Sequence, residues 1–288
     1  MLIPYNFGGF EERLSDYEQS RVVIFPVPYD GTLSYRAGSR NGPSAIISAS
    51  RALEFYDIEL NASPYEIGIH TTCELEPIVS SPEDMINEIE RVSQKFIRDN
   101  KFLIMLGGEH SISTGVVRNL KKKYKRLSVL QIDAHSDLRD TYEGTKYNHA
   151  CVMRRIRELC PAVQVGIRSM CEEEAIFIRR KNIRIFYAEE IRGRTDYIDD
   201  VLKGLTEDVY ITIDLDGLDP SIMPAVGTPE PGGLLWYDTL NLLKEVFKAR
   251  NVVGADVVEL SPLPPDVSSD FLAAKLVYKI IGYKFFLR

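Results

Sequence analysis

Apolar runs of four to six residues recur along the chain, separated by longer amphipathic stretches. The runs are rich in Val and Ile and alternate poorly between apolar and polar positions, which is typical of strands covered on both faces of a sheet. They lie at Val22–Val27, Phe102–Leu106, Leu127–Ile132, Ala162–Ile167, Ile183–Phe186, Val209–Ile213 and Val252–Val257. We therefore expect each of these runs to form a buried strand.

Amphipathic segments between the runs show helical spacing. The clearest begins at Ser81, which can cap a helix, continues with Pro82 at the first helical position, and keeps an apolar stripe up to Asn100. Further helices are expected from near Ser113, over Tyr237–Arg250 and over Asp270–Tyr283. Alternation of strands and helices over the whole length predicts an α/β fold. We expect a single domain, residues 1–288, with a mostly parallel sheet covered by helices on both faces.

Polar residues directly follow four of the predicted strands. These residues are Gly107–Ser111, Asp133–Asp137, Asp214–Asp219 and Glu259. Because ligands bind outside the carboxyl ends of parallel strands, we expect these segments to meet at one edge of the sheet. Residues two apart in an extended chain point to the same side, so each segment presents several ligands in one direction. Gly107 and Gly108 are expected to let the chain turn sharply after its strand.

Six of these side chains form a candidate metal centre. They are His110, Asp133, His135, Asp137, Asp214 and Asp216. Alone, the Asp133–Asp137 segment could be a surface turn or a single-ion site, and Asp214–Gly217 could be a fragment of a calcium loop. Together they are harder to explain without cations, because four close carboxylates cannot all stay ionised. Two divalent ions would balance the charge, and a ligand set rich in oxygen and free of thiolate favours Mn²⁺ over Zn²⁺.

The same segments resemble the signature motifs of the ureohydrolases, the family that includes arginase and agmatinase. Gly107–Ser111, Asp133–Asp137 and Asp214–Pro220 match the three motifs of the family. Tyr147–Ala150 and Gly227–Gly233 resemble the agmatinase branch in particular. The resemblance implies an arginase-like fold, which is a single three-layer α/β domain around a largely parallel sheet.

The resemblance also implies a role for each side chain. One Mn²⁺ would be held by His110, Asp133, Asp137 and Asp214. The second would be held by Asp133, His135, Asp214 and Asp216. Two Mn²⁺ per chain are therefore the expected cofactors. His149 matches the proton-transferring histidine of the family, and Glu259 matches the carboxylate that receives the guanidinium group, so both are expected to bind substrate and take part in catalysis.

The activity implied is hydrolysis of a guanidino C–N bond to give urea and an amine. Agmatine, which would give putrescine, is the expected substrate, and this places the enzyme in polyamine biosynthesis. An aminopropylated agmatine is the nearest alternative, followed by guanidinobutyrate and arginine. The loop over residues 138–148 leaves the far end of the substrate open. There Asp140 and Glu143 could attract an amine, whereas Arg139 or Lys146 could meet a carboxylate, and Glu230 on a later loop is assigned no role.

Two other classes of protein are alternatives to a two-ion hydrolase. A non-catalytic, metal-binding regulatory homologue is disfavoured because all six ligands, His149 and Glu259 are present. A zinc deacetylase with a single ion is disfavoured because two separate strands end in paired ligands. Metal content per chain would separate both from a two-ion hydrolase.

Composition and charge narrow the partners. The chain has 35 Lys and Arg against 42 Asp and Glu, a net charge of −7, which disfavours a nucleic acid or an anionic membrane but does not disfavour a small cationic substrate. No signal peptide or spanning segment is recognised, so we expect a cytoplasmic enzyme. The four cysteines are expected to stay reduced and His70 to be structural or at the surface. The family resemblance implies a homo-oligomer, a trimer or a hexamer.

Overall fold

The computed structural model describes residues 3–287. Its central element is a single sheet of eight parallel strands. The strand order is β2-β1-β3-β8-β7-β4-β5-β6, and every neighbouring pair is parallel. The strands are β1 (Val22–Val27), β2 (Ile69–Thr71), β3 (Phe102–Gly107), β4 (Leu127–Ile132), β5 (Ala162–Ile167), β6 (Ile185–Tyr187), β7 (Asp208–Asp214) and β8 (Asn251–Val258). The predicted parallel α/β sheet is confirmed.

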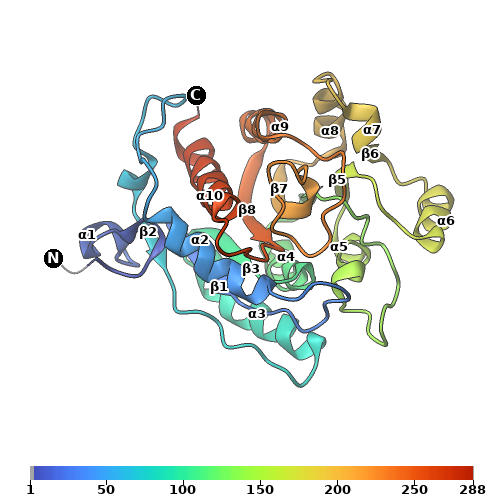
Figure 1. Cartoon of the computed structure of the whole chain (residues 1–288), viewed down its shortest axis with the longest axis horizontal. Helices are drawn as coiled ribbons and strands as arrows, with labels where there is room; N and C mark the ends of the chain where they lie inside the picture. The colour runs from blue at the N-terminus through green and yellow to red at the C-terminus, as the bar shows by residue number, and fades with distance from the viewer. Residues whose placement is uncertain (1–2, 288) are drawn as a thin grey trace.

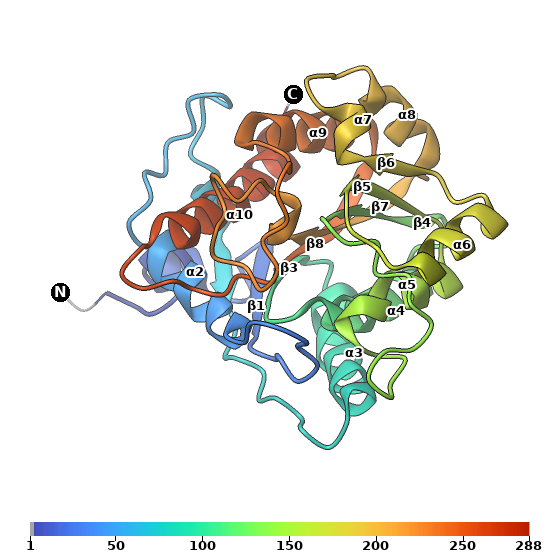
Figure 2. The ribbon, with the colours of Figure 1, turned by 45° about the vertical axis from the view of Figure 1, so that its right-hand side comes forward.

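Helices cover both faces of this sheet (Figures 1 and 2). Those packed on one face include α2 (Gly42–Ser50), α8 (Tyr197–Gly204), α9 (Trp236–Ala249) and α10 (Ser268–Phe286). Those packed on the other face include α3 (Pro82–Arg98), α4 (Ser113–Lys123), α5 (Val152–Leu159) and α6 (Glu172–Lys181). Two single-turn helices, α1 (Glu12–Ser15) and α7 (Ala188–Ile191), complete the set. The three-layer arrangement implied by the family resemblance is therefore confirmed.

Both faces of the strands are buried, which explains why the apolar runs do not alternate. Every residue of β1, β3, β4 and β5 is buried. Val22 and Ile24 of β1 pack into one hydrophobic core, whereas Val23 and Phe25 pack into the other. Successive side chains of a strand point to opposite faces, so a strand between two helical layers needs apolar residues at nearly every position.

Helix α3 follows the prediction from the sequence closely. The Ser81 hydroxyl accepts a hydrogen bond from the backbone N–H of Asp84 at 3.1 Å, and Pro82 occupies the first turn. The apolar stripe that includes Met85 and Ile89 is buried. The helix ends at Arg98, two residues before the predicted Asn100, which has a positive φ of 57° that a helix cannot contain.

The edge strand β2 was not predicted, because three residues are too few to show a pattern. It carries His70, whose Nδ1 lies 2.8 Å from the carbonyl oxygen of Ser15. This contact agrees with the structural role expected for His70. Within the described residues, the four cysteines form no disulfide. Over the same residues, no helix has the length and apolar character needed to cross a bilayer.

Candidate metal centre

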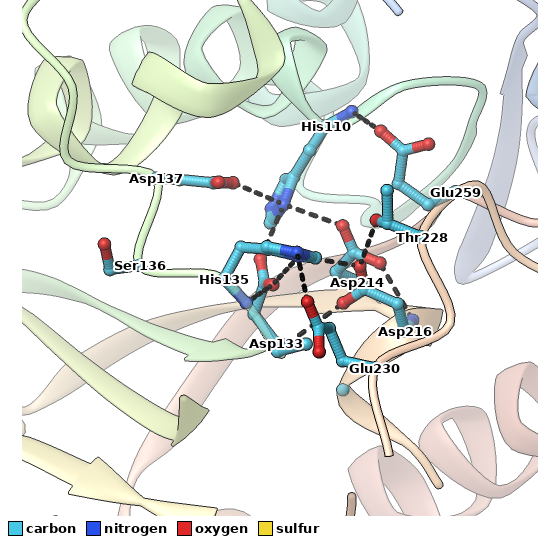
Figure 3. A network of polar contacts seen from close by, with 12 residues as sticks. His110, Asp133, His135, Ser136, Asp137, Asp214, Asp216, Thr228, Glu230 and Glu259 are labelled. Carbon is cyan, nitrogen blue, oxygen red and sulfur yellow. Dashed lines mark hydrogen bonds and ion pairs between the residues drawn. The ribbon is translucent and has the colours of Figure 1, made fainter. Parts of the chain in front are cut away.

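The candidate site lies at the carboxyl ends of four strands that are consecutive in the sheet, β3, β8, β7 and β4. The end of β7 and the loops that follow the four strands bring all six predicted ligands and Glu259 together, with the rings of His110 and His135 turned toward the carboxylates (Figure 3). This is the edge where open parallel sheets bind ligands. The sequence therefore predicted which side chains would meet here.

His110 is surrounded by carboxylates. Its Nδ1 lies 3.0 Å from Asp133 Oδ2 and 3.3 Å from an oxygen of both Asp137 and Asp214. The ring is buried, and Nδ1 has no well-oriented hydrogen bond to any described residue. Burial lowers the pKa of His110, but the three carboxylates outweigh burial and hold the pKa well above its usual value. A buried nitrogen that faces three anions without a hydrogen bond is suited to bind a cation.

His135 forms a second group with Asp216. Its Nδ1 lies 2.9 Å from Asp216 Oδ2 and 3.7 Å from Asp133 Oδ1. Burial lowers the pKa of His135, but Asp216 and then Asp133 outweigh it and raise the pKa to about 11. Burial likewise raises the pKa of Asp216, but His135 outweighs it and lowers the pKa to about 2. The imidazole and the carboxylate therefore stabilise each other's charge.

Asp133 belongs to both groups, because its Oδ2 faces His110 and its Oδ1 faces His135. The potential ligand atoms of His110, Asp133 and Asp137 lie within 4.8 Å of one another, and so do those of Asp133, His135 and Asp216. Burial and the charges of Asp137 and Asp216 raise the pKa of Asp133 to about 8. A carboxylate with one oxygen in each group is placed to bridge two cations.

Asp214, the other residue expected to be shared, lies close to the first group. Its Oδ2 is near His110, while its Oδ1 accepts a hydrogen bond from the backbone N–H of Asp216 at 2.9 Å. Burial, together with the charges of Asp216 and Asp133, raises the pKa of Asp214 well above its usual value. Across residues 3–287, the ion pairs of these carboxylates are with His110 and His135 and none is with Lys or Arg. The ligand set is therefore short of positive charge and fits hard divalent cations.

Two residues of the site adopt the left-handed backbone conformation, which residues other than glycine, asparagine and aspartate adopt rarely. Asp137 has a φ of 51° and Glu259 a φ of 67°. Such positions cost of order 1 kcal/mol each and persist only where the surroundings hold them. The carbonyl of Asp137 accepts two backbone hydrogen bonds from the start of α5, and the N–H of Glu259 donates to the carbonyl of Gly108 at 2.7 Å. These hydrogen bonds hold the backbone of both residues, whose side chains lie at the cluster.

Glu259 is a buried carboxylate beside the candidate metal ligands. Its Oε1 accepts a hydrogen bond from the backbone N–H of His110 at 2.8 Å. Burial, followed by the charges of Asp214 and Glu109, raises the pKa of Glu259 well above its usual value. Glu259 also lines the cavity above the cluster, so a cationic group entering that cavity would supply the charge partner that it lacks.

His149 lines the same cavity but does not belong to either group of potential ligands. Its Nδ1 lies 3.3 Å from the hydroxyl of Thr32, and its Nε2 lies 3.4 Å from the hydroxyl of Ser34. Burial lowers the pKa of His149. The ring is therefore neutral near pH 7 and can accept a proton inside the cavity.

The cavity has a volume of about 270 Å³ and opens over the cluster. Its floor includes His110, His135, Asp137, Asp214, Asp216 and Glu259. Its walls include Tyr35, Arg36, Arg139, Tyr142 and Met170, together with Gly227 and Thr228 from the long loop after β7. This volume accommodates a small polar head group with a narrow tail.

Comparison with known proteins agrees with this geometry. Residues 20–282 match the sequence model of the Arginase family. The chain belongs to the arginase family. The predicted resemblance to the ureohydrolases is therefore confirmed, and so is the prediction that the protein is an enzyme of this type.

Relatives within the arginase family cover almost the whole chain. The N(1)-aminopropylagmatine ureohydrolase of Synechocystis sp. is 44% identical over 280 residues, which cover 94% of this chain and 92% of the relative. The agmatinase of Pyrococcus horikoshii is 34% identical, and the match covers 98% and 99% of the two chains. The crystal structure of the agmatine ureohydrolase of Thermoplasma volcanium superposes with a TM-score of 0.89 at 35% identity, covering 99% of this chain and 95% of that one. The arginase-like fold is therefore confirmed.

Two buried glutamines of this arginase-family chain support the centre and were missed by the sequence analysis. Gln131 Nε2 donates to Asp133 Oδ2 at 2.6 Å, and Gln164 Nε2 donates to Gln131 Oε1 at 2.6 Å. Both glutamines lie inside strands that are otherwise largely apolar. A fully buried polar residue needs a partner, so a glutamine within such a run was the signal that could have identified them.

A second missed contact lies behind His149. Glu109 is fully buried and accepts hydrogen bonds from the backbone N–H and the hydroxyl of Thr32, the latter at 2.6 Å. Burial raises the pKa of Glu109 to about 7. Thr32 in turn contacts both the ring and the backbone N–H of His149. The loop after β1 is thereby fixed against the loop that carries His149.

The glycines after β3 have a different role from the predicted one. Neither Gly107 nor Gly108 has a positive φ, so the turn itself does not require glycine. A Cβ at Gly108 would instead collide with the backbone carbonyl of Tyr29. Gly217 shows the same constraint, because a Cβ there would lie 2.7 Å from the backbone nitrogen of Asp133. These glycines allow the ligand loops to pack directly against one another.

The residues considered for the far end of the substrate differ in whether they line the cavity or are paired with another side chain. Asp140 pairs with Arg155 at 2.6 Å and is therefore already neutralised. Among the four candidates of the 138–148 loop, Arg139 lines the cavity, and its guanidinium lies 4.5 Å from the centre of the Tyr142 ring. Glu230 approaches His135, with 3.9 Å between Oε1 and Nε2.

Proposed function

We propose that the cluster holds two Mn²⁺ ions and that the enzyme hydrolyses a guanidinoalkylamine, either agmatine or agmatine with an N1-aminopropyl group, to urea and an amine. The observation that carries this proposal is Asp133, because its two oxygens face two separate histidine–carboxylate groups. The proposed ligands are the six predicted from the sequence, with Asp133 and Asp214 shared. The oxygen-rich ligand set supports Mn²⁺.

Two divalent ions, when bound, would balance the aspartates and supply hydroxide from water at neutral pH. The protein itself contributes orientation. A planar guanidinium can donate two parallel hydrogen bonds to a carboxylate, and Glu259 faces the cavity next to the cluster. Because one Glu259 oxygen is already held by the His110 backbone, the direction of the guanidinium is restricted and its carbon is aimed at the floor of the cavity.

His149 is proposed to carry the proton to the leaving amine. When the C–N bond breaks, the amine nitrogen must gain a proton before it departs. Burial keeps His149 neutral, so it can take up a proton released during attack and pass it on. The hydroxyls of Thr32 and Ser34, near its two ring nitrogens, hold the ring at the wall of the cavity.

The outer part of the cavity supports a substrate with an extended tail. Tyr35 lines the cavity and is 80% exposed, so the opening leads to solvent. Asp140 is paired with Arg155 and does not line the cavity, so it is not placed to select an amine. A longer polyamine tail can therefore continue into solvent. The 44% identity to an N(1)-aminopropylagmatine ureohydrolase supports the aminopropylated substrate as a second candidate beside agmatine.

Assembly and location are part of the same proposal. We propose a homo-oligomer, a trimer or a hexamer, working in the cytoplasm on a small molecule. The net charge of −7 supports a cationic substrate and disfavours nucleic acid as a partner.

The test is urea release by protein reconstituted with Mn²⁺, measured with agmatine, N1-aminopropylagmatine, guanidinobutyrate and arginine, with bound metal counted in parallel. We expect two ions per chain and urea from one or both of the first two substrates. Urea only from guanidinobutyrate or arginine would overturn the proposed substrate class. Two bound ions with no urea from any of the four would overturn the guanidino assignment. Glu259→Gln is the matched control, because it should keep both ions and lose turnover.

A further inference from the structure

A chain of buried hydrogen bonds leads from the metal centre into the middle of the sheet. Thr212 of β7 and Asp256 of β8 are both fully buried. The Nε2 of His110 lies 2.8 Å from the Thr212 hydroxyl, and that hydroxyl lies 2.6 Å from Asp256 Oδ1. The other oxygen of Asp256 accepts a hydrogen bond from the hydroxyl of Tyr210 at 2.6 Å.

The direction of these hydrogen bonds follows from what each group can donate. A carboxylate can only accept, so the Thr212 hydroxyl donates its hydrogen bond to Asp256. The Thr212 oxygen has no second proton, and it must accept from the Nε2–H of His110. The neutral ring is therefore protonated at Nε2, which leaves the lone pair of Nδ1 pointing at the carboxylates of the cluster. Nδ1 is the nitrogen that lacks a well-oriented hydrogen bond.

We propose that Thr212 and Asp256 are positioning residues for metal binding: they hold His110 in the tautomer and orientation that present Nδ1 to one metal ion. This inference rests on the proposed two-ion centre. Partners on the far nitrogen of a ligating histidine fix its ring orientation and raise its basicity as a ligand. Thr212 contacts His110 directly, whereas Asp256 acts through Thr212.

Among residues 3–287, the second histidine of the centre has no comparable support. His135 Nε2 is 3.9 Å from Glu230 Oε1, which is too far for a hydrogen bond. Its side chain is 27% exposed, whereas that of His110 is 1% exposed. The positioning effect should therefore be confined to the ion bound by His110, and loss of the Thr212 hydroxyl should weaken one ion and not the other.

The experiment measures Mn²⁺ binding isotherms of chelator-stripped protein by calorimetry, with free Mn²⁺ followed by electron paramagnetic resonance. Thr212→Val keeps the shape of the side chain and removes the hydroxyl. We expect it to weaken one of the two ions by about 10–100-fold and to leave the other unchanged. Thr212→Ser restores the hydroxyl and should restore binding of the first ion, which a general loss of packing would not predict.

Two further variants separate positioning from simple stability. Asp256→Asn can still accept the Thr212 proton through its amide oxygen, so it should weaken the same ion by less than Thr212→Val does. Tyr210→Phe removes the other hydrogen bond to Asp256 without touching the chain to His110, so both ions should bind as in the wild type. Equal weakening in Tyr210→Phe and Thr212→Val would overturn the positioning role.

Failure of this inference differs from failure of the proposed function. Wild-type protein that binds fewer than two ions would overturn the two-ion centre itself. Wild-type protein that binds two ions, together with a Thr212→Val variant that binds both equally well, would overturn only the positioning role of Thr212 and Asp256.

Discussion

Two buried clusters of charge in this molecule are built in opposite ways. The candidate metal centre gathers five carboxylates around two histidines, and its ion pairs within residues 3–287 involve no Lys or Arg. The other cluster joins α10 to the loop before β2. There Lys279 Nζ lies 2.9 Å from Asp57 Oδ2 and 2.6 Å from Glu59 Oε2, and Glu59 also meets Lys244 at 2.8 Å.

The difference separates a site that needs an external partner from one that is complete. Carboxylates buried together repel one another and keep their protons unless cations arrive. A buried lysine between two acids is neutralised within the protein and contributes to holding its elements together. Removing a charged side chain should therefore affect mainly function in the candidate metal centre and mainly stability in the α10 cluster.

The largest effect is expected from Asp133→Ala. Both groups of potential ligands lose their shared carboxylate, so bound metal should fall and urea release should drop. The drop should exceed about 100-fold, which is the largest loss typical for a residue that only hydrogen-bonds to a metal ligand. Metal analysis and a urea assay measure the two quantities. Asp200→Ala, which removes an exposed carboxylate on α8, is the matched control and should leave both unchanged. Two ions and normal turnover in Asp133→Ala would contradict the shared-ligand arrangement.

The next effect is on stability and concerns Lys279→Met. This variant leaves Asp57 buried without its cation, which should lower the free energy of unfolding by about 3–5 kcal/mol. Chemical denaturation measures the loss, and turnover of the folded protein should not change. Lys203→Met removes an exposed ion pair with Asp200 and should lower stability by less than about 1 kcal/mol. A similar small loss in Lys279→Met would mean that the α10 cluster is not structural.

A smaller effect of opposite sign is expected from Asp214→Asn. The pKa of Asp214 is raised well above its usual value in the fold, so its ionised form opposes folding at neutral pH. Asparagine resembles the protonated form and can still accept the Asp216 N–H. Metal-free Asp214→Asn should therefore be more stable than the metal-free wild type by on the order of 1 kcal/mol, although it binds Mn²⁺ less well. Denaturation in chelator tests this, and a less stable variant would refute the like-charge account.

The smallest effect is on the pH dependence of stability, where the two clusters should differ in sign. Burial, followed by the charges of Asp137 and Asp216, raises the pKa of Asp133 from 3.8 to about 8, so the metal-free protein should lose stability as pH rises through that interval. Burial raises the pKa of Glu59, but Lys244, Lys279 and Tyr283 outweigh it and lower the pKa from 4.5 to about 2. This contribution is present above pH 4.5 and is lost as pH falls toward 2.

Unfolding of chelator-treated protein across this pH range separates the two contributions. Glu59→Gln should flatten only the acid side of the curve, and added Mn²⁺ should flatten only the alkaline side. If the loss of stability at low pH is the same in Glu59→Gln as in the wild type, the α10 cluster does not cause that loss.

The sheet and the meeting of the six candidate ligands could be predicted because the evidence for them is local. A buried parallel strand needs an apolar run, and Asp133, His135 and Asp137 follow such a run at alternate positions. The supporting hydrogen bonds could not be predicted in the same way. Gln131 meets Gln164 only after β4 and β5 pair, and Thr212 meets Asp256 only after β7 and β8 pair.

The pairing of Asp140 with Arg155 shows a second limit of sequence reasoning. Asp140 lies on the loop after the ligands of β4 and looked available to an amine. Its partner, Arg155, lies on α5. Nothing in the local sequence distinguishes a paired carboxylate from a free one. Substrate selectivity depends on such pairings, so the tail of the substrate was harder to predict than the chemistry at its head.

The strand order also determines when the centre can form during protein synthesis. All six proposed ligands precede residue 217, yet His110 and Asp133 follow β3 and β4, which are separated in the sheet by β7 and β8. Strand β8, residues 251–258, is the last to leave the ribosome. A nascent chain can therefore carry every proposed ligand before the candidate metal centre has assembled. Binding of metal at the proposed centre would then depend on completion of the polypeptide, and a chain that ends before β8 should not bind the proposed ions.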